Sequence, residues 1–496
     1  MTFLPLLIAI PLLSAFLIPL LSKLWKPFAP IIGNITTFLL FVLSLYGIAV
    51  IQGFPMLVYK FGNWPPPIGI VFSFDALSAF MTLVISIVVF SGALFAIRYL
   101  NHYTGQWKFW TLYMLITTGL MGISVTGDLF NMFVWIEISA IASYALVSFG
   151  TEAEELEAAF KYMVMGEIAG MTLLLTIALI YAKTSTLNLA DIALSLQTIM
   201  GSAFYWSILS LLLFAFSVKA ALVPFHFWLP DAHPSAPAPI SSLLSGVFIK
   251  VLGVYTSARF VFNIFGLSRE NAPFFFNILI GLGLLSIIFA GVTALNQNDY
   301  KRLLGYSTVS QVGYIMLGFG IGNFYGVAGA ILYILAHSLA KGLLFLTSGS
   351  VVYATGTRDI NKLGGLGEKM QTTAWSFRFG ALSLIGLPPL VGFFAKFLIA
   401  IGAIKQGFLW LAIVAIGFSG VTLGYLLRIE NNVYLKKNGV EAKESPFLMR
   451  VAMVFLVILI IILGFGYKPL MDFVIQPAAE ALLRGTEYIN LILGGL

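Results

Sequence analysis

Seven ionisable side chains lie inside stretches of this sequence that are otherwise apolar. They are four lysines, two glutamates and one histidine: Lys219, Lys250, Lys341, Lys396, Glu137, Glu167 and His337. An ionisable side chain at membrane depth costs roughly 2.5–3.5 kcal/mol on insertion scales, so the four lysines together would cost about 10 kcal/mol. Groups this expensive indicate a function, and amines, carboxylates and imidazoles are groups that take up and release protons.

The spacing of these groups favours proton transfer between them. His337 and Lys341 are four residues apart, so they lie on one helix face and can share a water molecule or a proton. A buried lysine beside a carboxylate keeps its proton, whereas a lysine without such a partner is ready to release it. If Glu137 pairs with Lys219, moving a neighbouring charge would move the proton, and a row of such sites would form a switchable path.

Structural roles stay open for the same residues. A lysine such as Lys250 can extend its amine to the membrane interface, and a polar pair can simply hold two helices together. Glu167, in "YMVMGEIAGMTLL", lies near one end of its apolar stretch. A structural role there is as compatible with the sequence as an extra proton site.

Prolines interrupt two of the apolar stretches beside a lysine. Pro224 follows Lys219, and Pro388 and Pro389 precede Lys396. Proline removes a backbone donor and frees carbonyl groups that only a polar, hydrated interior can satisfy, and broken helices that carry a charge are typical of transport sites. The lysine precedes the proline in the first stretch and follows the prolines in the second, and this opposite order also favours an inverted repeat.

The elements that position these residues are predicted to be transmembrane helices. Hydrophobic residues make up 60% of the 496, charged residues 9%, and mean hydropathy is +0.99. The apolar segments have the length of membrane-spanning helices rather than barrel strands. We expect an all-α polytopic membrane protein with about fourteen helices, at residues 2–22, 29–52, 71–98, 109–126, 128–149, 160–183, 203–223, 238–262, 273–296, 304–322, 324–354, 373–404, 408–430 and 448–466.

These helices are predicted to form two inverted five-helix repeats, each with one discontinuous helix. The predicted parts are N-terminal helices at 1–108, the repeats at 109–262 and 273–430, and a loop, a helix and an amphipathic tail at 431–496. With the N-terminus outside, sixteen Lys and Arg residues fall in inner loops and seven in outer ones. The positive-inside rule then places both termini outside the cell membrane. The first apolar stretch lacks a basic leader and a cleavage site, so we expect a retained helix.

Composition also limits the chemistry of the chain. The absence of cysteine excludes disulfides, thiolate metal sites and iron–sulfur ligation, so we predict that the chain itself binds no metal or cofactor. The basic residues behind the net charge of +7 lie mostly in short loops between the apolar stretches, as the positive-inside rule predicts. This charge therefore does not indicate nucleic acid binding. His226, Asp231 and His233 are expected at the inner mouth, as loop or inlet residues rather than members of the proton path.

Three stretches carry a family resemblance: "KAALVPFHFWLPDAHPSAPAPISSLLSGVFIKVLGVY", "AHSLAKGLLFL" and "LPPLVGFFAKF". Together they resemble the antiporter-like proton-translocating subunits shared by complex I, Mrp-type multisubunit Na+/H+ antiporters and membrane-bound hydrogenases. The resemblance covers residues from about 110 to 425 and implies transport of H+, with Na+ as a second candidate ion, next to partner membrane subunits.

The resemblance also implies a role for each residue that matches its motifs. Glu137 and Lys219 would form the pair of the first half-channel, and Lys250 the bridge. His337 and Lys341 would lead to the second half, and Lys396 would be its outlet. The discontinuous helices would break near Pro224 and Pro388. Glu167 departs from the family pattern.

Two features indicate which member of the family the chain resembles. The chain ends soon after the fourteenth predicted helix, without a long lateral helix, and Lys396 stands where one complex I subunit carries glutamate. Both favour the D subunit of Mrp antiporters or its hydrogenase counterpart. A proton-pumping subunit of complex I is the alternative, and the chain is not expected to be catalytic alone.

Three other classes of function stay open. A stand-alone carrier for an organic solute would be active without partners. A quinone-binding anchor of an oxidoreductase could use "DAHPSAP". If the polar residues only hold subunits together, their removal would leave ion exchange unchanged.

Overall fold

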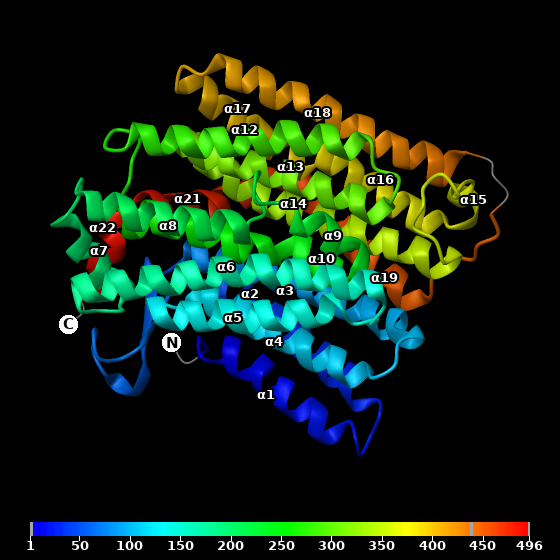
Figure 1. Cartoon of the computed structure of the whole chain (residues 1–496), viewed down its shortest axis with the longest axis horizontal. Helices are drawn as coiled ribbons and strands as arrows, with labels where there is room; N and C mark the ends of the chain where they lie inside the picture. Colours follow the sequence, from blue (N-terminus) through cyan, green and yellow to red (C-terminus); the bar gives the residue numbers. More distant parts are fainter. Residues whose placement is uncertain (1–2, 437–439, 495–496) are drawn as a thin grey trace.

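The computed structural model describes residues 3–436 and 440–494. Most helices lie side by side along the longest axis of the molecule (Figure 1). Both termini lie at one end, here called the terminal end, and α15 (Leu366–Lys369) lies at the opposite end, here called the loop end. A bundle of this kind satisfies backbone hydrogen bonds within each helix, which a chain in lipid requires.

The helices occur in four groups along the chain. The first group is α1 (Leu6–Leu21), α2 (Phe28–Ile51), α3 (Ala76–Tyr99) and α4 (Gln106–Val125). The second group is α5 (Leu129–Val147), α6 (Ala153–Thr184), α7 (Leu189–Gln197), α8 (Ala203–Lys219), α9 (Trp228–Ser235), α10 (Ala238–Leu243) and α11 (Thr256–Ala258). The third is α12 (Pro273–Leu295), α13 (Tyr300–Ile321), α14 (Phe324–Thr355), α15, α16 (Gln371–Ile385), α17 (Val391–Lys405) and α18 (Leu409–Ile429). The last is α19 (Phe447–Phe465), α20 (Tyr467–Leu470), α21 (Gln476–Leu483) and α22 (Gly485–Leu493).

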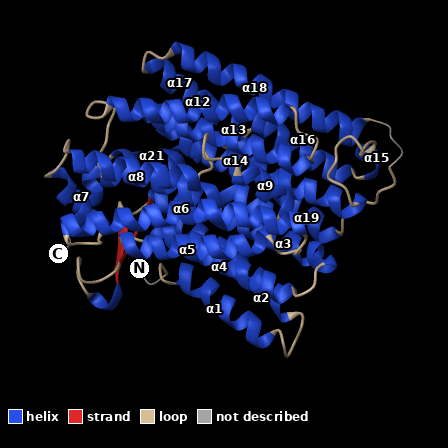
Figure 2. Ribbon diagram, in the orientation of Figure 1, coloured by secondary structure: helices blue, strands red, loops and turns tan. Residues whose placement is uncertain are grey.

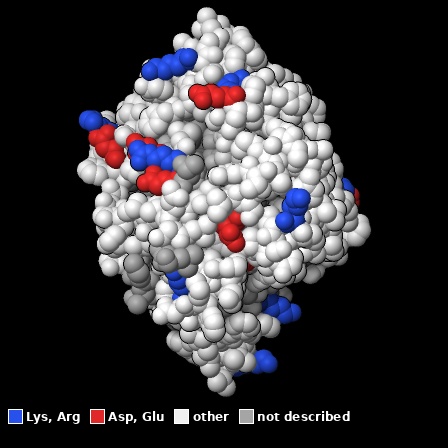
Figure 3. All heavy atoms as spheres, turned by 90° about the vertical axis from the view of Figure 1, so that its left-hand side faces the viewer, with Lys and Arg blue, Asp and Glu red and all other residues white. Residues whose placement is uncertain are grey.

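The prediction of a mostly helical, polytopic membrane protein is confirmed. Within the described residues, nine helices are long and apolar enough to cross a membrane, and α1 and α8 are shorter apolar helices. The terminal end shows only scattered charged side chains on a largely uncharged surface (Figure 3). The predicted tail after residue 466 forms α20 to α22, and its residues 495 and 496 lie outside the described part.

A β-hairpin replaces the beginning of the predicted helix at 71–98. Strand β1 (Met56–Lys60) pairs antiparallel with β2 (Val71–Asp75), and α3 begins only at Ala76 (Figure 2). The Asp75 side chain accepts a hydrogen bond from the Ser78 backbone N–H, which caps the helix at that point. Hydropathy alone missed this boundary because Val71, Phe72 and Phe74 of β2 precede the apolar helix without an intervening polar loop. The sequence analysis also missed α7, which lies in a predicted loop.

Two helical segments form the centre of the bundle. One runs from Ala238 to Ile264 and contains π-helical turns at Leu244–Phe248, Lys250–Tyr255 and Arg259–Ile264. The other is α14, which packs against α13, α16 and α17. The most apolar, membrane-length part of each segment is completely buried, so any polar group on it is shielded from lipid.

Two helices on either side of this centre are interrupted. Helix α8 ends at Lys219 and α9 begins at Trp228, with Pro224 in the gap. Helix α16 ends at Ile385 and α17 begins at Val391, with Pro388 and Pro389 in the gap. Each interruption leaves carbonyl groups without a helical partner in the interior of the bundle.

Candidate functional site

Glu137 and Lys219 form an ion pair between α5 and the end of α8. The Lys219 Nζ lies 3.5 Å from the Glu137 Oε1, and the side chains are 5% and 17% exposed, respectively. Gly170 on α6 allows this arrangement, because a Cβ at that position would lie 2.7 Å from the same carboxylate oxygen. Three helices therefore enclose the pair that the sequence predicted.

Lys250 is completely buried at a π-helical turn. Its Nζ donates hydrogen bonds to the backbone carbonyls of Ser245 and Gly246, each at 2.6 Å. A π-helical turn changes the regular i→i−4 pattern and exposes carbonyl oxygens, and such turns are frequent at functional sites. Within residues 3–436 and 440–494, backbone carbonyls hold this amine and no carboxylate pairs with it.

His337 and Lys341 share one face of α14 and are both completely buried. The Lys341 Nζ donates a hydrogen bond to the Leu304 carbonyl at 3.0 Å. Neither ring nitrogen of His337 has a hydrogen-bond partner among the described residues. The charges of Lys250, Lys341 and Lys396 all act on its ring.

Lys396 lies at the second helix interruption. Its Nζ donates hydrogen bonds to the carbonyls of Leu384 and Ile385, at 3.0 and 3.3 Å, and to the Ser419 hydroxyl at 3.2 Å. These carbonyls belong to the last turn of α16, which has no continuing helix to bond with. The interruption therefore supplies the acceptors that hold this amine in place.

Tyr333 lies beside both His337 and Lys396, and the sequence analysis missed it. The Tyr333 ring lies 6.1 Å from the His337 ring and 5.7 Å from the Lys396 amine. The Tyr333 hydroxyl donates a hydrogen bond to Gln311, which in turn bonds to Tyr425. The one available signal was spacing, because Tyr333 precedes His337 by four residues and so shares its helix face.

His233 and Lys301 differ most from what the sequence predicted. His233, expected at the inner mouth outside the proton path, is completely buried and stacks on the Phe345 ring at 4.3 Å. Lys301, assigned to a loop, is only 2% exposed, and its Nζ donates to the Ala236 carbonyl at 2.7 Å. His233 is close enough to both Lys301 and Lys341 for their charges to interact.

The other two residues expected at the mouth differ from each other. The His226 side chain is buried and contacts the Phe289 ring. The Asp231 side chain is 25% exposed and forms ion pairs with Lys161 at 3.3 Å and Arg302 at 3.1 Å. Asp231 thus lies on α9 at a partly exposed position.

A cavity of about 790 Å³ opens at the loop end and reaches Lys301. Its polar lining includes Glu154, Glu155, Asp299 and Arg358. Arg358 bridges Glu154 and Asp299, at 3.4 and 3.2 Å. Lys301, His233 and Lys341 therefore form a buried series of ionisable groups that begins at this cavity.

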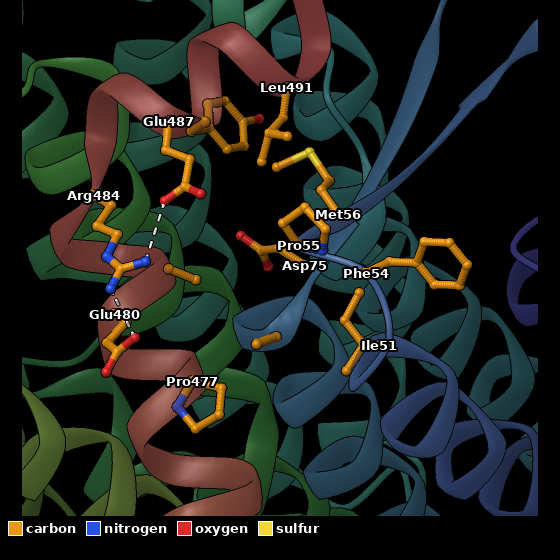
Figure 4. Close-up of a pocket in the computed structure, with 13 residues that line it drawn as sticks. Ile51, Phe54, Pro55, Met56, Asp75, Pro477, Glu480, Arg484, Glu487 and Leu491 are labelled. Atoms are coloured by element: carbon orange, nitrogen blue, oxygen red, sulfur yellow. Dashed lines mark hydrogen bonds and ion pairs between the residues drawn. The ribbon is translucent and has the colours of Figure 1, made fainter.

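Another buried ion pair lies near the terminal end, away from the residues described above. Arg259 donates two hydrogen bonds to the Asp75 carboxylate, and the two residues are 6% and 3% exposed. A cavity of about 150 Å³ ends at Asp75 and is walled on its other side by Glu480, Arg484 and Glu487 of the C-terminal helices (Figure 4). No group of three or more His, Cys, Asp or Glu side chains in the described part of the chain could hold a metal ion.

Comparison with known families identifies most of the chain. Residues 126–423 match the family described as "NADH:quinone oxidoreductase/Mrp antiporter, TM". Residues 66–110 match the N-terminal region of chain 5 of complex I. The first of these ranges includes all six residues of the predicted proton path: Glu137, Lys219, Lys250, His337, Lys341 and Lys396.

Full-length relatives include subunits of redox complexes and of antiporters. The chain is 35% identical to the N subunit of NADH-quinone oxidoreductase from Desulforudis audaxviator, over 95% of this chain and 97% of the relative. It is 34% identical to the D subunit of the Na(+)/H(+) antiporter from Alkalihalophilus pseudofirmus, over 88% of each chain.

Solved structures give the same result. A chain of the Mrp complex from Dietzia superposes with a TM-score of 0.91 at 26% identity, covering 99% of both chains. A chain of the archaeal membrane-bound sulfane sulfur reductase superposes with a TM-score of 0.90 at 30% identity, covering 99% of this chain and 100% of that one. The protein described here therefore belongs to the NADH:quinone oxidoreductase/Mrp antiporter transmembrane family.

Proposed function

We propose that the chain is the antiporter-like, ion-translocating subunit of a multisubunit membrane complex. Protons would move through the row formed by Glu137, Lys219, Lys250, His337, Lys341 and Lys396, with Na+ as the second transported ion. The observation that supports this most is the environment of the row. Among the described residues, Lys250, Lys341 and Lys396 are buried without a carboxylate in ion-pair range and hydrogen bond to backbone carbonyls instead.

This environment suits a proton carrier because a neutral amine can keep the same hydrogen bonds. Lys219 holds its proton while Glu137 stays beside it, and it releases the proton when a neighbouring charge weakens that pair. Lys250 accepts it, and the two unpartnered ring nitrogens of His337 can receive a proton on one side and donate one on the other. Lys341 and Lys396 continue the path to the second interruption.

The architecture that accompanies this function has fourteen crossings and two inverted repeats. We place the repeats at 109–262 and 273–430, each with one discontinuous helix, after N-terminal helices at 1–108 and before a final part at 431–496. The gaps at Pro224 and at Pro388 and Pro389 support this division, because Lys219 precedes one gap and Lys396 follows the other. Both termini would face outside the cell membrane.

The D subunit of an Mrp antiporter, or its counterpart in a membrane-bound hydrogenase, is the assignment that we favour. The likeness to the Mrp complex and to the sulfane sulfur reductase over almost the whole chain supports it. A pumping subunit of complex I is the second candidate, supported by the 35% identity to an N subunit of NADH-quinone oxidoreductase. Purification of the native complex separates the antiporter from the two redox complexes, because a hydrogenase or complex I requires iron–sulfur or NiFe partner subunits and the antiporter does not.

Removing the first ion pair tests the proposed path. In the reconstituted complex, Lys219→Ala and Glu137→Ala should each lower sodium exchange driven by a pH gradient by about tenfold or more, as loss of a proton-transfer group does. Lys183→Ala, at an exposed position at the end of α6, should leave exchange unchanged. Wild-type exchange by both pair variants in intact complexes would mean that these residues only hold the assembly together.

A further inference from the structure

The ion pair of Glu137 and Lys219 has a second carboxylate beside it. Glu167 lies one turn from Gly170, the residue that contacts the Glu137 carboxylate, and its charge interacts with both Glu137 and Lys219. Its side chain is partly exposed on α6, which runs beside α5 along one flank of the bundle (Figure 1). One lysine therefore faces two carboxylates at membrane depth, which leaves the cluster one negative charge in excess.

A nearby hydroxyl also lacks a partner. Tyr144 on α5 is only 7% exposed, and its Oη has no hydrogen-bond partner in the described part of the chain. The hydroxyl lies against Gly166, where a Cβ would collide with it, and its surroundings include the charges of Glu137 and Glu167. A buried polar group without a partner is uncommon, so this site is incomplete in the isolated chain.

The surface around Glu167 is apolar and exposed. Ile168 and Met171 on α6 are 46% and 64% exposed, and Ile141 on α5 is 61% exposed. A partly exposed carboxylate in such a surface would face hydrocarbon if lipid covered it, which is strongly unfavourable. The apolar rim suits contact with another membrane helix, and the excess negative charge requires that helix to supply a positive one.

We propose that this face of α5 and α6 docks a neighbouring membrane subunit whose helix presents a lysine or arginine to Glu167. The incoming side chain neutralises the excess charge of the cluster that surrounds the buried Tyr144 hydroxyl. It also places a charge from another subunit next to Lys219, the first amine of the row. This inference rests on the proposed function only in taking the chain as one subunit of an assembly, and it does not require that protons move through the row.

Cross-linking identifies what covers this face. The chain contains no native cysteine, so Met171→Cys introduces a single reactive thiol beside Glu167. In the intact purified complex, a thiol-reactive reagent with a photoactivatable second arm, which reacts with any neighbouring residue, should join the substituted position 171 to a partner helix that carries a Lys or Arg, identified by mass spectrometry. Ile416 on α18 is 62% exposed, close to the 64% of Met171, so Ile416→Cys is the control for reactivity at an exposed apolar position.

Three results of this experiment would overturn the proposal. They are labelling of position 171 by a lipid-soluble maleimide in the intact complex, a cross-link to another copy of this chain, and a cross-link to a partner helix without a basic residue. Because none of these readouts measures transport, they are separate from the test of Lys219 and Glu137.

Charge reversal tests the pairing itself. Glu167→Lys should lower the amount of cross-linked partner that copurifies with the chain by about tenfold or more, because it places two positive groups together at an interface. Changing the partner's cross-linked basic residue to Glu should restore copurification. Glu157→Lys, on the same helix at an exposed position near the loop end, is the matched control and should keep the partner.

The milder variant Glu167→Gln is a control for misfolding caused by Glu167→Lys. Its chain should elute as a single species and still lose partner retention, though less than Glu167→Lys. Full partner retention by both Glu167 variants, or failure of the compensating change in the partner, would overturn the pairing. Loss of ion exchange with full partner retention would also contradict it, because it would assign Glu167 to the path instead of the interface.

Discussion

At the scale of single residues, burial separates the lysines and arginines of this chain into two groups. Lys301 and Arg302 are adjacent in sequence, yet Lys301 is 2% exposed and the Arg302 side chain is 45% exposed. Lys301 lines the loop-end cavity and lies near His233, whereas Arg302 pairs with Asp231 at the surface. We predict that Lys301 is an inlet from the cavity to the proposed proton path.

Substitution of these two neighbours tests the inlet. Lys301→Met should lower proton-driven exchange by about tenfold or more, because it removes a proton carrier from the path. Lys301→Arg should be equally impaired, since a guanidinium keeps the charge and cannot be deprotonated in a protein. Arg302→Met, measured in the same vesicles, should retain near wild-type exchange. Normal exchange by Lys301→Arg would show that the position needs only a charge.

At the scale of elements, close packing of helix backbones positions the row. The π-helical turn that carries Lys250 packs against the end of α8, and a Cβ on Gly253 would lie 2.5 Å from the Ala220 Cα. Since Ala220 follows Lys219 directly, Gly253 determines how closely these two lysine-bearing segments approach.

A single methyl group at this contact should disturb the site. Gly253→Ala should destabilise the protein by about 1–3 kcal/mol, as overpacking of a dense core does. Gly417→Ala on α18, where a Cβ would meet no atom within 4 Å, should leave stability unchanged or slightly higher. The thermal unfolding midpoint in detergent measures both. Equal midpoints would mean that the two segments can separate without cost.

At the scale of the whole molecule, the Asp75–Arg259 ion pair connects distant parts of the chain. Asp75 ends the hairpin and caps α3, and Arg259 lies at the terminal end of the central helical segment. Asn263, which accepts a hydrogen bond from Arg259 at 3.0 Å, donates to the carbonyls of Ala481 and Leu482 in the C-terminal helices. The network therefore joins the N-terminal hairpin, the centre and the C-terminal helices.

Breaking this pair should be costly. Asp75→Asn leaves the buried Arg259 without its counterion and should destabilise the protein by about 3–5 kcal/mol. Glu480→Gln, which removes one member of the partly exposed pair with Arg484 in Figure 4, should have little effect on the unfolding midpoint. Similar midpoints for the two variants would contradict a central role for Asp75.

The same pair predicts how stability depends on pH. Burial alone would raise the pKa of Asp75, but the Arg259 charge and its hydrogen bonds hold this pKa below its ordinary value. A carboxyl whose pKa is lower in the folded state stabilises the fold above the unfolded pKa of about 4, and this contribution is lost as the pH falls through the folded pKa. Asp75→Asn should therefore flatten the acid limb of the stability curve.

The sequence alone was sufficient to predict the features that follow from the free-energy cost of placing polar or charged groups in a membrane. The helical class follows from apolar length, and Glu137, Lys219, Lys250, Lys341 and Lys396 are conspicuous because a charge in an apolar stretch is expensive. Prolines next to two of these lysines predicted the interrupted helices, and the structure shows both gaps. Their roles as members of one path stay a prediction.

Only the tertiary structure decided which residues of polar segments become buried. In sequence, Lys301 and His233 stand among other charged or turn-forming residues, and strand β2 continues directly into an apolar helix. Packing of α9 against α13, and of α13 against α14, brings Lys301 and His233 near Lys341, and packing of α5 and α6 leaves Glu167 at the surface. Burial depends on contacts between residues far apart in the chain, and a local pattern of residue types does not contain those contacts.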